Sequence, residues 1–179
     1  GGAPFTPVIS DANAAYADVL EFDVSTLEPI VAAPPDPENV VPVSSVAGKE
    51  IHQIFIGTCA GGKLDDLRAA ASVLKGRRIA PHVRALIAPS TQRILQQADK
   101  EGLLATFMAA GATILTPGCA ACSGSTGPLA DGERCITTGT NNKPGRMGSK
   151  DAEIYLANAV TVAASAVAGK IVDPRDVLN

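Results

Sequence analysis

Short apolar runs in the second half of the chain predict the strands of a buried sheet. Such runs, bounded by glycine, proline or polar residues, are typical of strands covered on both faces. Three of them cover residues 51–56, 83–88 and 112–116, and a shorter one covers 135–138. The first and third end directly at segments that contain cysteine. The pattern therefore predicts strands whose ends meet chemically interesting loops.

Between these runs, apolar residues recur every three or four positions, which indicates amphipathic helices. We expect helices over about 64–75, 90–101, 104–110 and 151–168. Ser90 is the expected N-cap of the second helix, because a serine hydroxyl accepts from a free amide in the first turn. A glycine follows each helix, as helix C-termini favour: Gly76, Gly102, Gly111 and Gly169.

Alternating strands and helices predict an α/β fold. We expect residues 51–179 to form a three-layer α/β/α domain with a mostly parallel sheet. In such sheets, ligands collect where strands end and loops begin.

Residues 1–50 lack this regular pattern and are expected to form an extended leader that continues from a missing N-terminal part. Residues 21–24 have the alternation of a short strand. Pro34, Pro35 and Pro37 exclude a helix or a central strand around them, because proline fixes φ and cannot donate to a ladder.

Composition narrows the function classes. The net charge is −3 and only 3% of residues are aromatic, so no basic, aromatic-lined surface for nucleic acid is expected. The longest apolar run is too short for a membrane helix. Four cysteines are too few for a disulfide scaffold, which favours a reduced, cytoplasmic setting in which thiols bind metals or do redox chemistry.

Three cysteines are the candidate site. Cys59 follows the strand at 51–56, and the C-x-x-C pair Cys119 and Cys122 follows the strand at 112–116. Because parallel strands end at one edge of a sheet, the three thiolates can converge on one centre. Three ligands leave one position of a metal centre open.

Spacing alone leaves three kinds of site. A structural zinc needs four ligands, and Cys135 could supply the fourth, while His52 and His82 are expected to be ordinary structural residues. A thioredoxin-like pair would place the C-x-x-C after the first strand, whereas here it follows the third. An iron–sulfur cluster with three cysteine ligands would leave an iron open to substrate.

Several motifs in order resemble the aconitase superfamily, most closely the large subunits of 3-isopropylmalate dehydratase and homoaconitase. The segment 55–59 followed by 64–68 matches "IGxC…(D/E)DLR", and 117–122 matches "PGCxxC". The segments 132–135 and 145–148 match "GERC" and "GRxG", and 22–29 and 39–43 resemble the stretch that precedes the first motif. The resemblance covers nearly the whole chain.

The resemblance implies an aconitase domain 3-like fold and a [4Fe-4S] cluster held by Cys59, Cys119 and Cys122. Cys135 is then a buried thiol on a strand, and Arg146 binds a substrate carboxylate. The implied activity is a hydro-lyase reaction on an isopropylmalate-, homoaconitate- or dimethylmalate-like hydroxy acid, as in leucine biosynthesis. The family's catalytic serine and proton relay lie in other large-subunit domains and a small swivel subunit, so this chain is expected to need those partners and to be inactive alone.

Two departures from the family pattern affect substrate binding. Ala60 and Gly61 stand where the family has Thr-Asn, and Thr140 and Asn141 stand where it has Asn-Arg. Lys143 is a candidate substitute for the lost arginine, which makes Asn141, Lys143 and Arg146 the expected substrate-binding residues. We expect a substrate with fewer or differently placed carboxylates.

The same departures keep a different class of function open, a non-catalytic module that binds zinc or no metal. An RNA-binding regulator of this fold is disfavoured by the charge and the few aromatic residues.

Overall fold

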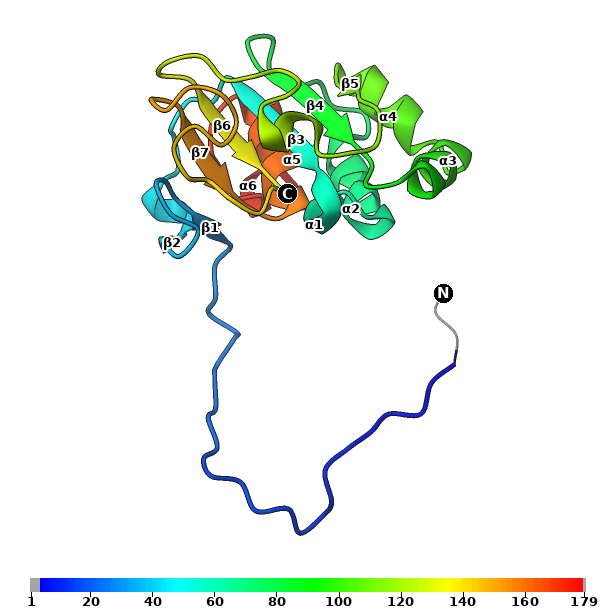
Figure 1. The fold of residues 1–179 in the computed structure, drawn as a ribbon, viewed down its shortest axis with the longest axis vertical. Coiled ribbons are helices and arrows are strands. Elements are labelled where there is room, and N and C mark those ends of the chain that lie inside the picture. Colours follow the sequence, from blue (N-terminus) through cyan, green and yellow to red (C-terminus); the bar gives the residue numbers. More distant parts are fainter. Residues whose placement is uncertain (1–3, 179) are drawn as a thin grey trace.

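The computed structural model describes residues 4–178, and its centre is one seven-stranded sheet in the order β2-β1-β7-β6-β3-β4-β5 (Figure 1). The strands are β1 (Ile30–Ala32), β2 (Val40–Pro42), β3 (Gln53–Gly57), β4 (Arg84–Ala88), β5 (Thr113–Ile114), β6 (Arg134–Thr137) and β7 (Glu153–Leu156).

The central strand β3 pairs in parallel with β4 on one side and with β6 on the other. Its Phe55 lies opposite Leu86 of β4 and Thr137 of β6. β5 and β7 extend the parallel part, and β1 pairs antiparallel with both β7 and β2. The predicted mostly parallel α/β sheet is therefore confirmed.

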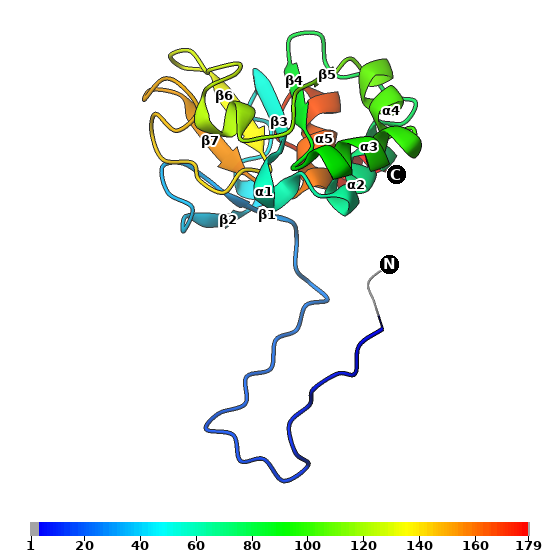
Figure 2. The ribbon, with the colours of Figure 1, turned by 45° about the vertical axis from the view of Figure 1, so that its right-hand side comes forward.

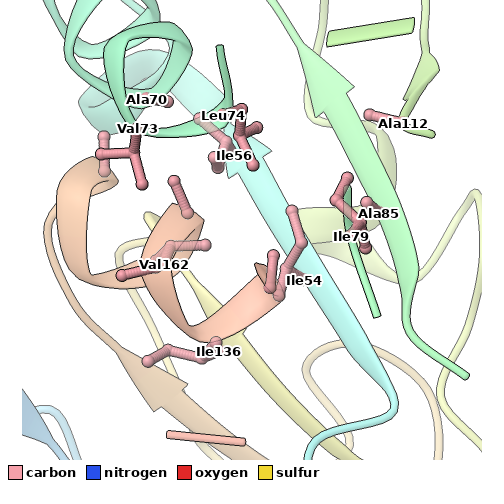
Figure 3. Close-up of a cluster of buried hydrophobic side chains, with 14 of the residues drawn as sticks. Ile54, Ile56, Ala70, Val73, Leu74, Ile79, Ala85, Ala112, Ile136 and Val162 are labelled. Carbon is pink, nitrogen blue, oxygen red and sulfur yellow. The ribbon is translucent and has the colours of Figure 1, made fainter. Parts of the chain in front are cut away.

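One face of the sheet is covered by helices. They include α2 (Leu64–Leu74), α3 (Gln92–Lys100), α4 (Leu103–Ala110) and α5 (Ala159–Ala168). Alternate residues of the strands, such as Ile54, Ile56 and Ile136, point into this layer and pack against Leu74 and Val162 (Figure 3). The aliphatic residues that the sequence supplies in place of aromatics build this core.

The other face is covered mainly by the loops before and after β6, residues 115–133 and 138–152, with the 3-10 helix η2 (Ala120–Ser123) in the first of them. Phe55 and Cys135 of the strands meet Ala121, Cys122 and Met147 there. Two of the candidate cysteines, Cys119 and Cys122, therefore belong to the loops that form this second layer.

Most predicted helix ends agree with the structure. α2 is followed by Gly76 at φ 72°, the left-handed conformation that glycine adopts at low cost. Gly111 and Gly169 are the left-handed C-caps of α4 and α5. The expected cap Ser90 is wrong: the N-cap of α3 is Thr91, whose hydroxyl accepts from the amide of Ile94.

The helix expected over 151–168 is wrong in its first part. Residues 153–156 form strand β7, and the helix α5 begins only at Ala159, after the N-cap Asn158. Ile154 fits the helical spacing, but its burial arises because it lies on a strand paired with β6. The apolar spacing of residues 153–156 is compatible with a helix or a strand, and pairing with β6 favours the strand.

The first fifty residues divide into two parts. Residues 4–29 run away from the sheet without helix or strand, so the strand expected at 21–24 is not formed (Figure 1, Figure 2). β1 and β2 then join the sheet around the turn at the prolines, and η1 (Val43–Ser45) follows. The boundary at residue 50 stays a prediction, although Val31 and Val43 upstream of it are fully buried.

The two remaining helices are short. α1 (Thr58–Gly61) follows β3 directly, and α6 (Arg175–Leu178) closes the described chain. Across residues 4–178, none of the helices has the length and apolar composition needed to cross a bilayer.

Candidate metal centre

The three candidate cysteines lie in loops that follow strands of the parallel part of the sheet. Cys59 is in α1, which follows β3, and Cys119 and Cys122 are at η2, in the loop after β5. Cys59 and Cys119 are exposed, whereas Cys122 is buried. The predicted placement of the cysteines beyond the ends of β3 and β5 is thus present.

The turn from β3 into α1 exposes Cys59 through an unusual backbone. Thr58 has φ 75°, a left-handed conformation that is uncommon for a β-branched residue. Its hydroxyl accepts from the amide of Ala60 at 3.1 Å, which helps to hold the turn. The next residue, Cys59, is therefore presented on a short, constrained loop rather than on a free one.

Thr138 ties this turn to the end of β6. Its Oγ1 accepts from the amide of Gly57 at 2.9 Å, and it lies 3.1 Å from the oxygen of Gly57 and 3.3 Å from that of Gly61 as a donor. The sequence pattern does not single out Thr138. The available signal was the polar run after β6, which falls at the same edge of the sheet as the cysteines.

Gly61 packs directly against this threonine. A Cβ at Gly61 would overlap Cβ and Oγ1 of Thr138 and lie 2.9 Å from its carbonyl oxygen. The side chain that the family pattern places at this position therefore has no room here, and Thr138 occupies that space.

The pair Cys119 and Cys122 is held by one turn of 3-10 helix. The amide of Cys122 donates to the oxygen of Cys119 at 2.8 Å. Ala121 and Cys122 pack into the apolar cluster with Phe55 and Ala88, which anchors the turn on the sheet. One sulfur of the pair is thereby buried and the other is open to solvent.

Arg146 reaches this turn from the loop before β7. Its Nη2 lies 3.5 Å from Sγ of Cys122, and its buried Nε has no hydrogen-bond partner among residues 4–178. Sequence spacing could not predict this contact, because the two residues are 24 positions apart. The structure thus brings a fixed cation to one of the three candidate sulfurs.

The other two expected substrate-binding residues have different surroundings. Oδ1 of Asn141 accepts from the amide of Lys143 at 2.9 Å, so this side chain shapes its own loop. Lys143 is exposed. Between them, Asn142 is buried and donates to the oxygens of Ala32 at 3.3 Å and Ala33 at 3.0 Å, which fixes the loop to the end of β1.

Cys135 lies at the other end of the strands. It is fully buried on β6 opposite Gln53, the first residue of β3, and burial raises the pKa of its thiol far above the ordinary range. A buried, protonated thiol is a poor metal ligand, and this one lies at the opposite ends of the strands from Cys59. Nearby, Arg84 donates two hydrogen bonds to Glu133 and holds the pKa of that carboxyl down at about 2.

The two histidines have structural contacts. Nδ1 of His52 accepts from the amide of Arg134 at 3.0 Å, and Nε2 of His82 lies 3.2 Å from the oxygen of Gly169. Each histidine thus has a structural contact of the kind expected for it.

The donor set decides which group would fit the site. Among residues 4–178, no three Cys, His, Asp or Glu side chains come close enough to hold one metal ion. The available ligands are thiols alone, and soft sulfur ligands suit iron–sulfur clusters as well as zinc. By donor type, the three thiols fit an iron–sulfur cluster, and they would also fit a zinc site completed by a fourth ligand. The ligand assignment stays a prediction.

Comparison with known proteins gives one consistent result. The model of the Aconitase family (aconitate hydratase) matches residues 4–169. The chain is 48% identical over 170 residues to the 3-isopropylmalate dehydratase large subunit of a Nitratiruptor species, covering 93% of this chain and 40% of that protein. It is 50% identical over 167 residues to the homoaconitase large subunit of Thermus thermophilus, again covering 93% and 40%. The chain thus spans about two fifths of the length of these curated relatives.

Proposed function

This chain belongs to the aconitase family, and we propose that it is the cluster-bearing part of an iron–sulfur hydro-lyase. The observation that carries the proposal is the placement of Cys59, Cys119 and Cys122 in loops after β3 and β5, with Arg146 against one sulfur. Relatives named as large subunits of 3-isopropylmalate dehydratase and homoaconitase support it. We propose a [4Fe-4S] cluster as the group held.

When bound, such a cluster supplies an open iron that acts as a Lewis acid on a substrate hydroxyl or carboxylate. In this proposal, the residues of this chain hold the cluster and orient the substrate. We propose that the three cysteines bind the group and that Arg146 binds a substrate carboxylate. Its Nε, which is buried and unpaired among residues 4–178, supports this role because it is a donor that lacks an acceptor. Cys135 takes no part, because it is buried on β6.

The proposed substrate is a small hydroxy acid of the isopropylmalate, homoaconitate or dimethylmalate type. Asn141 has no charge where the family motif has an arginine, and Lys143 is exposed in the same loop. Arg146, the cation of this loop that contacts a candidate ligand, lies against the sulfur of Cys122. We propose that the substrate has fewer or differently placed carboxylates than 3-isopropylmalate. Normal turnover of 3-isopropylmalate by the assembled enzyme would contradict this part.

We propose that the remaining large-subunit domains and a small subunit complete the active site. The relatives are named "large subunit", which supports a small-subunit partner. Large apolar side chains of the leader are also widely exposed, including Phe5, Val8, Ile9 and Phe22, and an extended apolar segment of this kind favours a covering partner. Alone, the chain is proposed to bind the cluster but to lack hydro-lyase activity.

Anaerobic reconstitution with iron and sulfide tests the proposal. We expect a brown protein whose visible absorption bleaches on reduction. Replacing any one of Cys59, Cys119 or Cys122 by alanine should abolish the colour. Cys135→Ala is the matched control, since it removes the remaining thiol and should leave the colour in place.

The departures at Gly61 and Asn141 favour one other candidate, a module of this fold that binds zinc or no metal. Stoichiometric zinc without colour, or a colourless metal-free chain after reconstitution, would establish that candidate and contradict the iron–sulfur proposal.

A further inference from the structure

The contact between Arg146 and Cys122 affects the cysteine sulfur as well as any bound carboxylate. Nη2 of Arg146 lies 3.5 Å from Sγ of Cys122, and Cys122 is only 4% exposed. A hydrogen bond from a charged donor is about twice as strong as a neutral one, and more so when both partners are shielded from water. We infer that Arg146 is a positioning residue, which fixes and stabilises the sulfur of Cys122.

The planar guanidinium of Arg146 couples the contact with Cys122 to the orientation of Nε, which has no hydrogen-bond partner among residues 4–178. Nε and Nη2 belong to one rigid plane, so the bond to Cys122 also fixes the direction in which Nε donates. Nε is buried without a partner among residues 4–178, which costs free energy unless an acceptor arrives. One side chain thus holds a sulfur with one nitrogen and offers another to an anionic group.

Both partners of the contact are anchored on the same part of the core. Met147, next to Arg146, is buried in the apolar cluster that also contains Cys122. The amide of Leu129 donates to the oxygen of Met147 at 2.8 Å, and a Cβ at Gly148 would meet the backbone of Leu129. The loop therefore has little freedom to carry Arg146 away from the sulfur, as positioning requires.

The consequence for the bound group rests on the proposed function. Hydrogen bonds and positive charge at a ligand sulfur stabilise the more negative, reduced state of an iron–sulfur cluster and raise its reduction potential. Losing Arg146 should therefore lower that potential. Arg146 would act on the cluster through Cys122, separately from any contact with substrate.

A metal-free experiment tests the contact itself. NMR spectra of the full 179-residue chain, carrying isotope-labelled cysteine, are compared for wild type, Arg146→Gln and Lys150→Gln. We expect Arg146→Gln to shift the Cys122 resonance and to leave that of the remote Cys135 in place. Lys150→Gln is the charge-matched control, because it removes one exposed cation from the same loop, and it should move neither. An unmoved Cys122 resonance in Arg146→Gln overturns the inference.

If Arg146→Gln does not fold, the reciprocal variant Cys122→Ala decides the question. The side-chain resonance of Arg146 should shift in that variant, and an unmoved resonance overturns the inference.

A second experiment tests the effect on the cluster. Wild type, Arg146→Gln and Lys150→Gln are reconstituted anaerobically with iron and sulfide, and their midpoint potentials are titrated. We expect a lower potential for Arg146→Gln and no change for Lys150→Gln. Equal potentials in all three overturn the tuning role. A wild-type chain that takes up no cluster contradicts the proposed function instead, and the NMR comparison still decides whether Arg146 positions Cys122.

Discussion

Gly61 and Ala60 are neighbours in sequence with opposite surroundings, although both depart from the family pattern. Ala60 is exposed, whereas a side chain at Gly61 would overlap Thr138. The hydroxyl of Thr138 in turn bonds the backbone of Gly57, so this side chain cannot move aside without breaking those hydrogen bonds. The glycine is thus required by the local packing of this chain.

Restoring the family residues one at a time tests this argument. We expect Gly61→Asn to lower the free energy of unfolding by about 1–3 kcal/mol, the usual cost of overpacking a filled site. The matched control Ala60→Thr places a side chain in solvent and should change it by less than about 0.5 kcal/mol. Urea unfolding followed by circular dichroism measures both. A Gly61→Asn chain as stable as wild type would show that Thr138 does not fill this space.

The candidate ligands were predictable from the sequence, but their neighbours were not. A C-x-x-C pair and a cysteine after a strand are local signals, so Cys59, Cys119 and Cys122 stand out without a structure. The contacts of Thr138 with Gly57 and of Arg146 with Cys122 join residues 81 and 24 positions apart. No spacing rule encodes such contacts, because they depend on how the loops pack.

At the scale of elements, the strands and helices between residues 51 and 116 were largely predictable. Their apolar runs are short, and a glycine marks each helix end. The error at 151–168 has a physical cause. Ile154 and Ala164 are spaced as if they lay on one face of a single helix, but Ile154 belongs to strand β7 and Ala164 to helix α5, and both are buried. The missed signal was Asn158, a favoured N-cap residue inside the expected helix.

That cap makes the new boundary of α5 testable. Oδ1 of Asn158 accepts from the amide of Thr161 at 2.9 Å, so it satisfies a free donor at the helix start. We expect Asn158→Ala to reduce stability by about 1 kcal/mol, and Asn158→Asp, which keeps the acceptor, to retain most of it. Thermal and urea unfolding of the three chains provide the comparison. Equal stability of wild type and the alanine variant would contradict the cap.

At the scale of the whole molecule, the chain combines a packed sheet domain with an extended segment. β1 and β2 belong to the sheet, although their sequence lies in the expected leader. Val31 of β1 is fully buried, and Asn142 from the Arg146 loop donates to the oxygens of Ala32 and Ala33. The N-terminal strands therefore support the loop that holds Arg146, which local sequence patterns could not indicate.

Two truncations separate the extended segment from the domain. A chain that begins at Glu28 loses residues 4–27, all of which are exposed, together with the three residues before them, and should unfold at the same urea concentration as the full chain. A chain that begins at Pro34 also loses β1, which removes the buried Val31 and leaves the amide of Asn142 with only its longest bond, to the oxygen of Asp36 at 3.4 Å. We expect this second truncation to cost about 2–5 kcal/mol, from a core cavity and a weakened buried hydrogen-bond network. It should also slow cluster uptake, since Asn142 lies four residues before Arg146 and fixes that loop to β1. Equal stability of the two truncated chains would place the start of the domain after β1, and a destabilised chain from Glu28 would place it before residue 28.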